Sequence, residues 1–191
     1  MLHKEIPCYI LAGGKSRRFG EDKLLYKING KSVIERVAET AKGVFKDVYI
    51  VAKDGEKFSF LNLPVIKDIK KEQASMIGLY TALVHSKGEE CFILSGDLPL
   101  ISEETIRFIL KNYNPPITLA KTEDKIHTLI GIYSKEVLNK LEEFVKEKNF
   151  KIYEFIKNFN YKAVELPAEL RKTVINLNKK DELEEVIMHL K

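Results

Sequence analysis

Residues 8–23 read CYILAGGKSRRFGEDK, and the rest of the fold is organised around this stretch. An apolar run over residues 6–11 predicts a buried strand, and the run stops at Ala12-Gly13-Gly14. Lysine or arginine then occupies positions 15, 17, 18 and 23. Glycines allow sharp turns in which N–H groups converge on phosphate oxygens, and the cations offset phosphate charge. The stretch therefore predicts a loop that binds a nucleoside triphosphate.

Two better-known phosphate loops do not match this stretch. A Walker A motif ending at Gly14-Lys15-Ser16 would need a glycine at position 9, which is tyrosine. A Rossmann dinucleotide motif starting at Gly13 would need a glycine at position 15, which is lysine. The alternative interpretation is a plain strand-to-helix turn with surface cations. We favour the phosphate loop because solubility alone does not explain four cations so close to the end of a buried strand.

The composition is ordinary for a globular protein and limits the possible partners. The 191 residues predict a single domain over 1–191. The formal net charge of +4 is too small to require a nucleic acid but suits ligands that carry phosphates. No apolar run approaches the ~20 residues of a membrane span, and residues 1–7 lack a signal-peptide pattern. Cys8 and Cys91 lie in apolar runs, which predicts buried reduced thiols and a cytoplasmic location.

Strand-like and helix-like patterns alternate along the chain. Apolar runs predict strands at 6–11, 47–52, 64–66, 91–94, 117–120, 127–133, 161–166 and 173–177. Helical spacing predicts helices at 31–43, 75–86, 102–112, 135–148, 153–159 and 180–190, the third with a capping box at Ser102. Polar residues 122–125 predict a hairpin turn. The alternation predicts a three-layer α/β/α fold around a mostly parallel sheet, with ligands bound beyond the carboxyl ends of the strands.

Asp97 is the leading candidate for a metal ligand. It follows an apolar strand in the segment CFILSGDLPL, between Gly96 and the stiff pair Leu98-Pro99. Mg²⁺ prefers one or two carboxylates together with phosphate oxygens and water. An aspartate in an ordinary turn is the alternative. The nearby phosphate loop makes the metal interpretation the better one.

Lys23 is the candidate for the cation that offsets charge on a pyrophosphate leaving group. Arg17 and Arg18 could serve the same purpose, or one of them could face solvent. These cations, with Asp97, predict catalysis by positioning and charge neutralisation.

The segment LAGGKSRRFGEDK closely resembles the L-A-G-G-x-S-x-R-M-G-x-D-K signature of the molybdenum cofactor guanylyltransferases, the MobA family, and departs from it at Phe19. The resemblance implies a Rossmann-like nucleotidyltransferase fold, similar to that of nucleotide-diphospho-sugar transferases. It implies Mg²⁺-dependent transfer of GMP from GTP to the terminal phosphate of molybdopterin, with release of pyrophosphate. Other cofactor-biosynthesis proteins are implied as further partners. The acceptor phosphate is itself an anionic nucleophile, so a Ser/His/Asp triad is not required.

The resemblance also implies roles for residues of the loop. Leu11, Ala12 and Gly13 would line the nucleotide through their backbone, Gly14 would keep the turn open, and Lys23 would contact phosphate. The segment around Asp97 resembles the D-x-P motif of the family, which implies that this carboxylate binds Mg²⁺ and the nucleotide.

Asp68 and His127 match the family less sharply. Asp68 matches an aspartate that contacts the nucleotide, and its carboxylate could accept from guanine N1–H and N2–H₂ or from the ribose; the alternative is a solvated loop aspartate beside Lys67 and Lys70. His127-Thr128 resembles the H-P-T-x-x-L segment of the family without its proline. That implies a contact with the pterin, whereas a packed or surface histidine is the alternative.

Residues 174–183, VINLNKKDEL, resemble the x-N-x-N-x-x-x-[DE]-L ending of the family. Asn176 and Asn178, two residues apart, would share one face of the predicted strand and offer amide groups to a pterin or a phosphate. The alternative is a pair of turn or helix-cap asparagines, and Asn176 is the stronger candidate.

Two departures from the family pattern concern the residues that would recognise the nucleotide base. Residues 74–79 read ASMIGL where the family usually has G-P-L-A-G, and Val51 replaces an asparagine of some relatives. A related cytidylyltransferase usually carries L-A-A-G and a proline in place of Asp22, so Gly13 and Asp22 favour guanine. The sequence also leaves open a sugar-phosphate nucleotidyltransferase and a non-catalytic nucleotide or pterin carrier.

Overall fold

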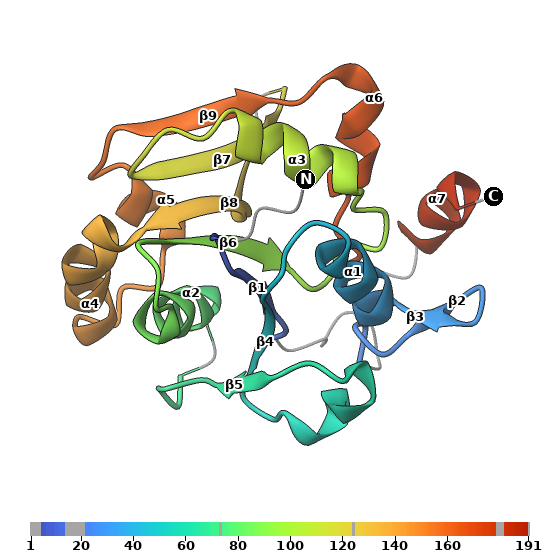
Figure 1. Ribbon diagram of the computed structural model, residues 1–191, viewed down its shortest axis with the longest axis horizontal. Coiled ribbons are helices and arrows are strands. Elements are labelled where there is room, and N and C mark those ends of the chain that lie inside the picture. The colour runs from blue at the N-terminus through green and yellow to red at the C-terminus, as the bar shows by residue number, and fades with distance from the viewer. Residues whose placement is uncertain (1–4, 14–21, 73, 124, 179–181, 191) are drawn as a thin grey trace.

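A seven-stranded sheet forms the centre of the computed structural model, which describes residues 5–13, 22–72, 74–123, 125–178 and 182–190 (Figure 1). The strand order is β5-β4-β1-β6-β8-β7-β9. The strands are β1 (Cys8–Leu11), β4 (Val48–Ala52), β5 (Val65–Lys67), β6 (Glu90–Ser95), β7 (Ile117–Thr122), β8 (Lys125–Ser134) and β9 (Tyr161–Glu165).

Strand direction confirms the mostly parallel sheet. Strands β5, β4, β1 and β6 run parallel, and Ile10 of β1 pairs with Ile50 of β4 and Leu94 of β6. Strand β8 is antiparallel to both of its neighbours, β6 and β7, whereas β9 is parallel to β7. Because β8 is reversed, its first residues lie at the edge where β1 and β6 end. The β7–β8 hairpin turn is also confirmed.

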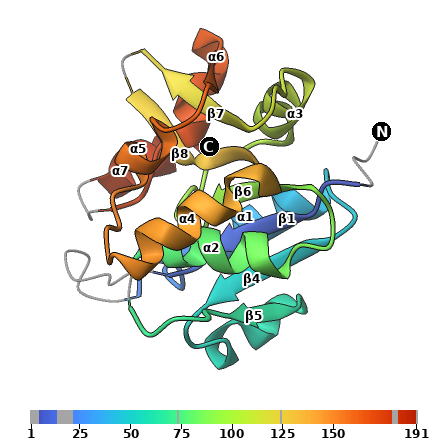
Figure 2. The same cartoon turned by 90° about the vertical axis from the view of Figure 1, so that its left-hand side faces the viewer.

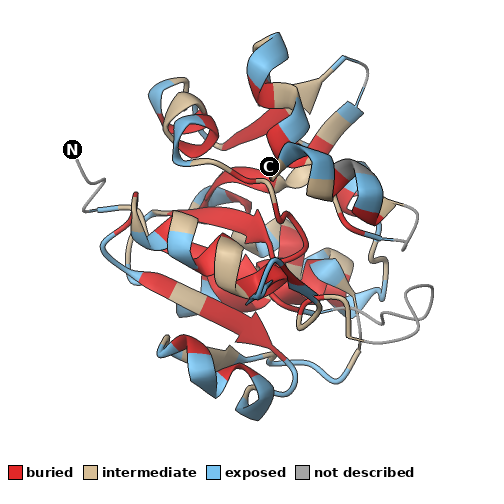
Figure 3. Ribbon diagram, turned by 90° about the vertical axis from the view of Figure 1, so that its right-hand side faces the viewer, coloured by how far each residue is buried: buried red, intermediate tan, exposed pale blue. Residues whose placement is uncertain are grey.

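Helices cover both faces of the sheet and confirm the three layers. Figure 1 shows α2 and α4 to the left of β1 and α1 to the right, and Figure 2 shows α2 and α4 from their outer side. Cys8 and Ile10 point into the core shared with α1 (Val33–Lys42) and α3 (Glu103–Lys111). Tyr9 and Leu11 point into the core shared with α2 (Ser75–His85), α4 (Leu138–Lys146) and α5 (Ile152–Ile156). Buried strands therefore lie between the helical layers (Figure 3).

A smaller apolar cluster lies beside α1. It joins the hairpin β2 (Lys27–Ile28) and β3 (Lys31–Ser32) to α7 (Glu182–His189) through Ile28, Val33, Leu177, Leu183 and Val186. The remaining elements are η1 (Glu56–Leu61), η2 (Lys135–Val137), α6 (Ala168–Arg171) and η3 (Lys172–Val174). Among the helices in the described part of the chain, none combines the length and apolar character that a membrane crossing needs.

Two details of local structure differ from the sequence predictions. The capping box forms at the start of α1, where Ser32 and Glu35 satisfy each other's backbone N–H groups. At α3, Ser102 accepts from Thr105 N as a simple cap, and the predicted box is wrong because the third helical residue is Thr105, which does not reach back to the cap N–H.

The predicted strand at 173–177 is also wrong. The chain forms the 3₁₀ turn η3 at 172–174, and residues 175–178 run on without a sheet partner. The Thr173 hydroxyl donates to Leu170 O and contacts Thr105 Oγ1, which favours a turn over an extended ladder. The apolar pattern there reflects burial of Val174 and Leu177 against helices, not sheet pairing.

The two cysteines are free and fully buried, as predicted. They lie on adjacent strands but point into opposite cores, Cys8 toward α1 and Cys91 toward α2. Burial raises the pKa of both thiols, so both stay protonated at neutral pH.

Candidate active site

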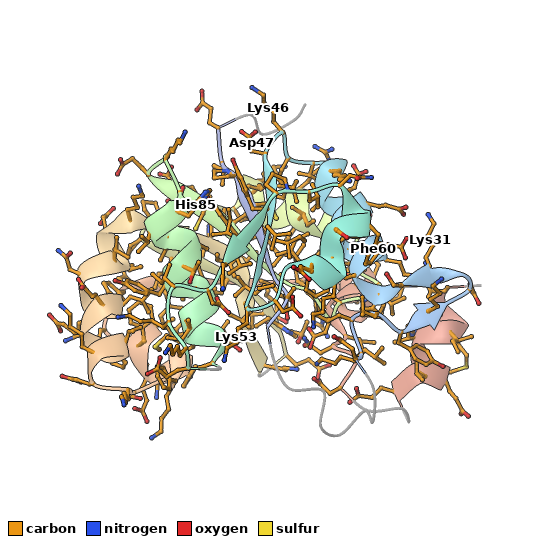
Figure 4. All side chains as sticks on the ribbon, turned by 90° about the horizontal axis from the view of Figure 1, so that it is seen from below. Lys31, Lys46, Asp47, Lys53, Phe60 and His85 are labelled. Carbon is orange, nitrogen blue, oxygen red and sulfur yellow. The ribbon has the colours of Figure 1, made fainter. Side chains whose placement is uncertain are left out.

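A pocket of about 260 Å³ lies at the carboxyl edge of the parallel strands. Figure 4 shows the two edges, with Lys46 and Asp47 before β4 at one end of the molecule and Lys53 after β4 at the other. The pocket lies at the second edge and is lined by Leu11, Gly13, Lys23, Val51, Asp68, Ala74, Ser75, Gly78, Ser95, Asp97, Leu129, Asn176 and Asn178.

Asp97 is the centre of a polar network in this pocket. Lys23 Nζ donates to Asp97 Oδ2 at 2.6 Å and to Asn178 Oδ1 at 3.0 Å. Asp97 Oδ1 accepts from Ser95 Oγ at 2.6 Å and from Asn176 Nδ2 at 2.8 Å. Asp97 is only 9% exposed, and its partners Lys23 and Asn176 come from distant parts of the chain, whereas Ser95 is two residues away. Such multiple bonds hold a carboxylate in one orientation.

Close backbone packing brings Asp97 to this position. Gly96 N donates to Leu11 O at 3.0 Å, and a Cβ at position 96 would lie 3.1 Å from that oxygen and 2.9 Å from Ile34 Cδ1. Glycine therefore lets the end of β6 approach the end of β1. Leu177 N donates to Asp97 O at 2.9 Å, which ties the asparagine segment to the same point.

The glycine loop and the first turn of α2 form another wall of the pocket. A Cβ at Gly13 would meet nothing within 4 Å, so the backbone there is open to a ligand. Helix α2 begins after Ala74, which forms no side-chain cap, and Ala74 and Ser75 at its start line the pocket. The positive end of a helix dipole favours an electronegative ligand there.

Asp68 follows β5 and lines the same pocket as Asn176. Asp68 N donates to Ala52 O at 3.1 Å, whereas its Oδ1 accepts, among the described residues, one long bond of 3.4 Å from Thr81 Oγ1. Partial burial raises the pKa of Asp68, and the Thr81 hydroxyl and the charge of Lys53 lower it by less. The carboxylate therefore retains acceptor capacity for a ligand.

His127 lies in a neighbouring hollow of about 150 Å³ that shares Ser95 and Asn176 with the pocket. Its Nε2 is 2.8 Å from Thr122 Oγ1. Burial lowers the pKa of His127 to about 4, and the charge of Lys125 contributes to the shift. At neutral pH the imidazole is uncharged, so it can form a hydrogen bond but cannot neutralise a phosphate.

The structure thus brings together most of the residues proposed from the sequence. Ala12 is not among the lining residues of the pocket and its N–H donates to Val51 O, so its backbone contact with the nucleotide stays a prediction. Gly14 and Arg17 lie outside the described residues. The sequence analysis did not identify Ser95 as a site residue. Its position two residues before Asp97, with Gly96 between them, could have indicated that its hydroxyl reaches the carboxylate. Residues 74–79, which the sequence comparison connected with the base, contribute Ala74, Ser75 and Gly78 to the lining of the pocket.

These features define a nucleotidyltransferase: a Rossmann-like sheet whose carboxyl edge carries Gly13, a lysine and a fixed aspartate. Comparison with known proteins agrees. Residues 8–163 match the family model described as MobA-like NTP transferase domain, and the chain belongs to that family.

Individual relatives cover nearly the whole chain. A protein of Aquifex aeolicus (strain VF5) named "Probable molybdenum cofactor guanylyltransferase" is 58% identical over 97% of this chain and 92% of its own. A crystal structure from Aquifex aeolicus VF5, also 58% identical, superposes with a TM-score of 0.83 over 94% of this chain and 95% of that one. Molybdopterin-guanine dinucleotide biosynthesis protein A of Archaeoglobus fulgidus, 22% identical, shares the fold with a TM-score of 0.82 over 96% and 97%.

Proposed function

We propose that this chain transfers GMP from GTP to the terminal phosphate of molybdopterin, which yields the guanine dinucleotide form of the cofactor and pyrophosphate. A phosphate oxygen of the acceptor forms a bond to the α-phosphorus of GTP. The bond from that phosphorus to the oxygen bridging to the β-phosphate breaks, and pyrophosphate leaves with the electron pair. The observation that carries the proposal is the meeting of Lys23, Asp97 and Asn176 beside the open backbone of Gly13.

The residues divide into a nucleotide side and an acceptor side. On the nucleotide side, Gly13 and the start of α2 contact GTP, Asp68 accepts hydrogen bonds from guanine or ribose, and Lys23 binds the phosphates. Arg17 remains a predicted phosphate contact in the part of the chain that is not described. On the acceptor side, the amides of Asn176 and Asn178 and the neutral His127 offer hydrogen bonds to the pterin.

The donor set fits Mg²⁺. Within the described residues, no three His, Cys, Asp or Glu side chains come close enough to hold a metal ion by themselves. Mg²⁺ instead suits one carboxylate completed by phosphate oxygens, and Asp97 is the residue that would hold it. When bound, the ion would neutralise charge that develops on the phosphates. Lys23, which bonds Asp97 Oδ2 here, would then be free to turn toward the phosphates of GTP.

Calorimetric binding of GTP, CTP and ATP in the presence of Mg²⁺ tests the nucleotide half of the proposal. We expect a clear preference for GTP, because the Asp68 carboxylate matches two guanine donors that cytosine and adenine do not present together. A preference for CTP would reassign the chain as a cytidylyltransferase. Failure to bind any triphosphate would contradict the nucleotide site itself.

Pyrophosphate release from GTP with molybdopterin as acceptor tests the transfer half. We expect release that requires the acceptor and Mg²⁺. GTP binding without release under any condition would identify a carrier and contradict the proposal. Asp47→Asn, on an exposed side chain at the opposite edge of the sheet, is a control that leaves both readouts unchanged.

A further inference from the structure

A second cavity of about 250 Å³ lies beside α1, away from the pocket described above. This open cavity is lined by α1, the loop that follows Asp97, the turn η3 and the end of α7, which lie together on one side of the sheet (Figure 1). Its lining residues are Arg36, Glu39, Thr40, Pro99, Leu100, Ile101, Lys172, Thr173, His189 and Leu190. Among described residues, the linings of the two cavities have no member in common.

The charges around this second cavity are unbalanced. Arg36 and Lys172 carry positive charge, and His189 can add to it when protonated. The one acidic side chain in the described lining, Glu39, is bonded by Lys31 Nζ at 2.9 and 2.7 Å, so its charge is already offset. The cavity therefore has a positive surplus that favours an anion.

Arg36 has an unmet hydrogen-bonding group. Its Nη2 donates to Ile28 O, whereas its Nε is buried and has no hydrogen-bond partner among the described residues. Buried polar groups in native proteins are nearly always bonded, so an orphaned donor on a cationic side chain calls for an explanation such as a bound ion or water. Guanidinium groups bind phosphate oxygens particularly well.

We propose that this cavity is a second anion site, which binds pyrophosphate through Arg36 and Lys172. Two segments that line the cavity lead along the chain to the active site. Residues 99–101 follow Asp97, and Thr173 precedes Asn176 by three positions. Thr40 Oγ1 donates to Ile101 O at 3.2 Å, which fixes the loop between the two cavities. The site does not depend on which nucleotide the active site takes.

Calorimetric titration with pyrophosphate and with orthophosphate tests this site. The titrations are made on the Lys23→Ala background, which weakens phosphate binding in the active site. We expect the Lys23→Ala protein to bind pyrophosphate in the second cavity. Adding Lys172→Ala should weaken this pyrophosphate binding about tenfold, as expected for the loss of one charge-assisted hydrogen bond. Lys172→Glu should weaken it further. Equal binding of orthophosphate would mean that one phosphate group suffices and would overturn the assignment to pyrophosphate.

Lys111→Ala is the matched control, because Lys111 is an exposed lysine that lines neither cavity. Arg36→Gln provides a second variant, read together with its melting temperature because Arg36 also bonds Ile28 O. Unchanged affinity in Lys172→Ala, an equal loss in Lys111→Ala, or no binding on the Lys23→Ala background would each overturn the proposal.

Discussion

Two carboxylates at the carboxyl edge of the sheet, Asp97 after β6 and Asp68 after β5, are held in contrasting ways. Asp97 accepts from Ser95 and Asn176 on one oxygen and from Lys23 on the other, at 2.6 to 2.8 Å. Asp68 has one side-chain partner among the described residues, the Thr81 hydroxyl at 3.4 Å. The protein therefore fixes the first carboxylate and leaves the second with free acceptor capacity.

The contrast teaches how one edge of a sheet serves two tasks. A group that stabilises developing charge works best when it is oriented in advance, since no reorganisation is then needed during the reaction. A group that recognises a ligand contributes most when its bonds are completed by that ligand alone. We infer that Asp97 serves chemistry and Asp68 serves recognition, and this contrast can be tested variant by variant.

The largest effect is expected from Asp97→Asn. The amide keeps the shape of the side chain but removes its charge, so it can neither balance Lys23 nor hold a divalent ion. Turnover should fall by about 10³-fold or more. The rate of pyrophosphate release is the measurement, with Asp47→Asn as the matched control. Activity within a few-fold of wild type would contradict the division of roles between Asp97 and Asp68, because Asp97 would then be dispensable for chemistry.

A smaller effect is expected from Asp68→Asn. The variant loses a charged acceptor, so GTP affinity should fall by about 10- to 100-fold, in line with one hydrogen bond to a charged group. Calorimetry with GTP and ATP distinguishes the two recognition roles. A contact with the base lowers GTP affinity selectively, whereas a contact with the ribose lowers both equally. Unchanged affinity for both nucleotides would remove Asp68 from the site.

The smallest expected effect is the change in the free energy of unfolding that Asp68→Asn causes in the absence of ligand. The raised pKa of Asp68 means that its stability contribution is complete below the unfolded pKa of about 3.9 and is lost as pH rises through the higher folded pKa. At pH 7 the charged form is thus unfavourable in the folded state, and Asn should stabilise the protein by up to about 1 kcal/mol, since solvent screens this half-exposed group.

Thermal unfolding at several pH values measures this difference. We expect the advantage of Asp68→Asn to be greatest near pH 7 and to shrink as pH falls through the raised folded pKa of Asp68, because protonation then removes the unfavourable charge. Asp97→Asn should show no such gain, because it breaks a satisfied network. A variant that is less stable than wild type at pH 7 would show that Asp68 is better paired than the Thr81 contact indicates.

Local sequence patterns predicted most of the fold of this chain. The alternation of apolar runs and helical spacing predicted the three layers, because each pattern reflects which face of an element must be buried. Asp68 and Asp97 could be found because each follows a strand whose end is evident in the sequence. The segment at 173–177 misled the same rules, since burial against helices and pairing in a sheet leave a similar apolar pattern.

The sequence by itself predicted the mostly parallel sheet and pointed to Gly13, Lys23, Asp68 and Asp97 as candidates, because these depend on local patterns in the chain. Only the tertiary structure decided that Ser95 and Asn176 both hold Asp97 and that Lys172 and Arg36 share a cavity. Ser95 is a near neighbour of Asp97 in the sequence, whereas Asn176, Lys172 and Arg36 reach their partners only because the fold brings distant elements together. Their geometry depends on how tightly the elements pack, which no single stretch of sequence specifies.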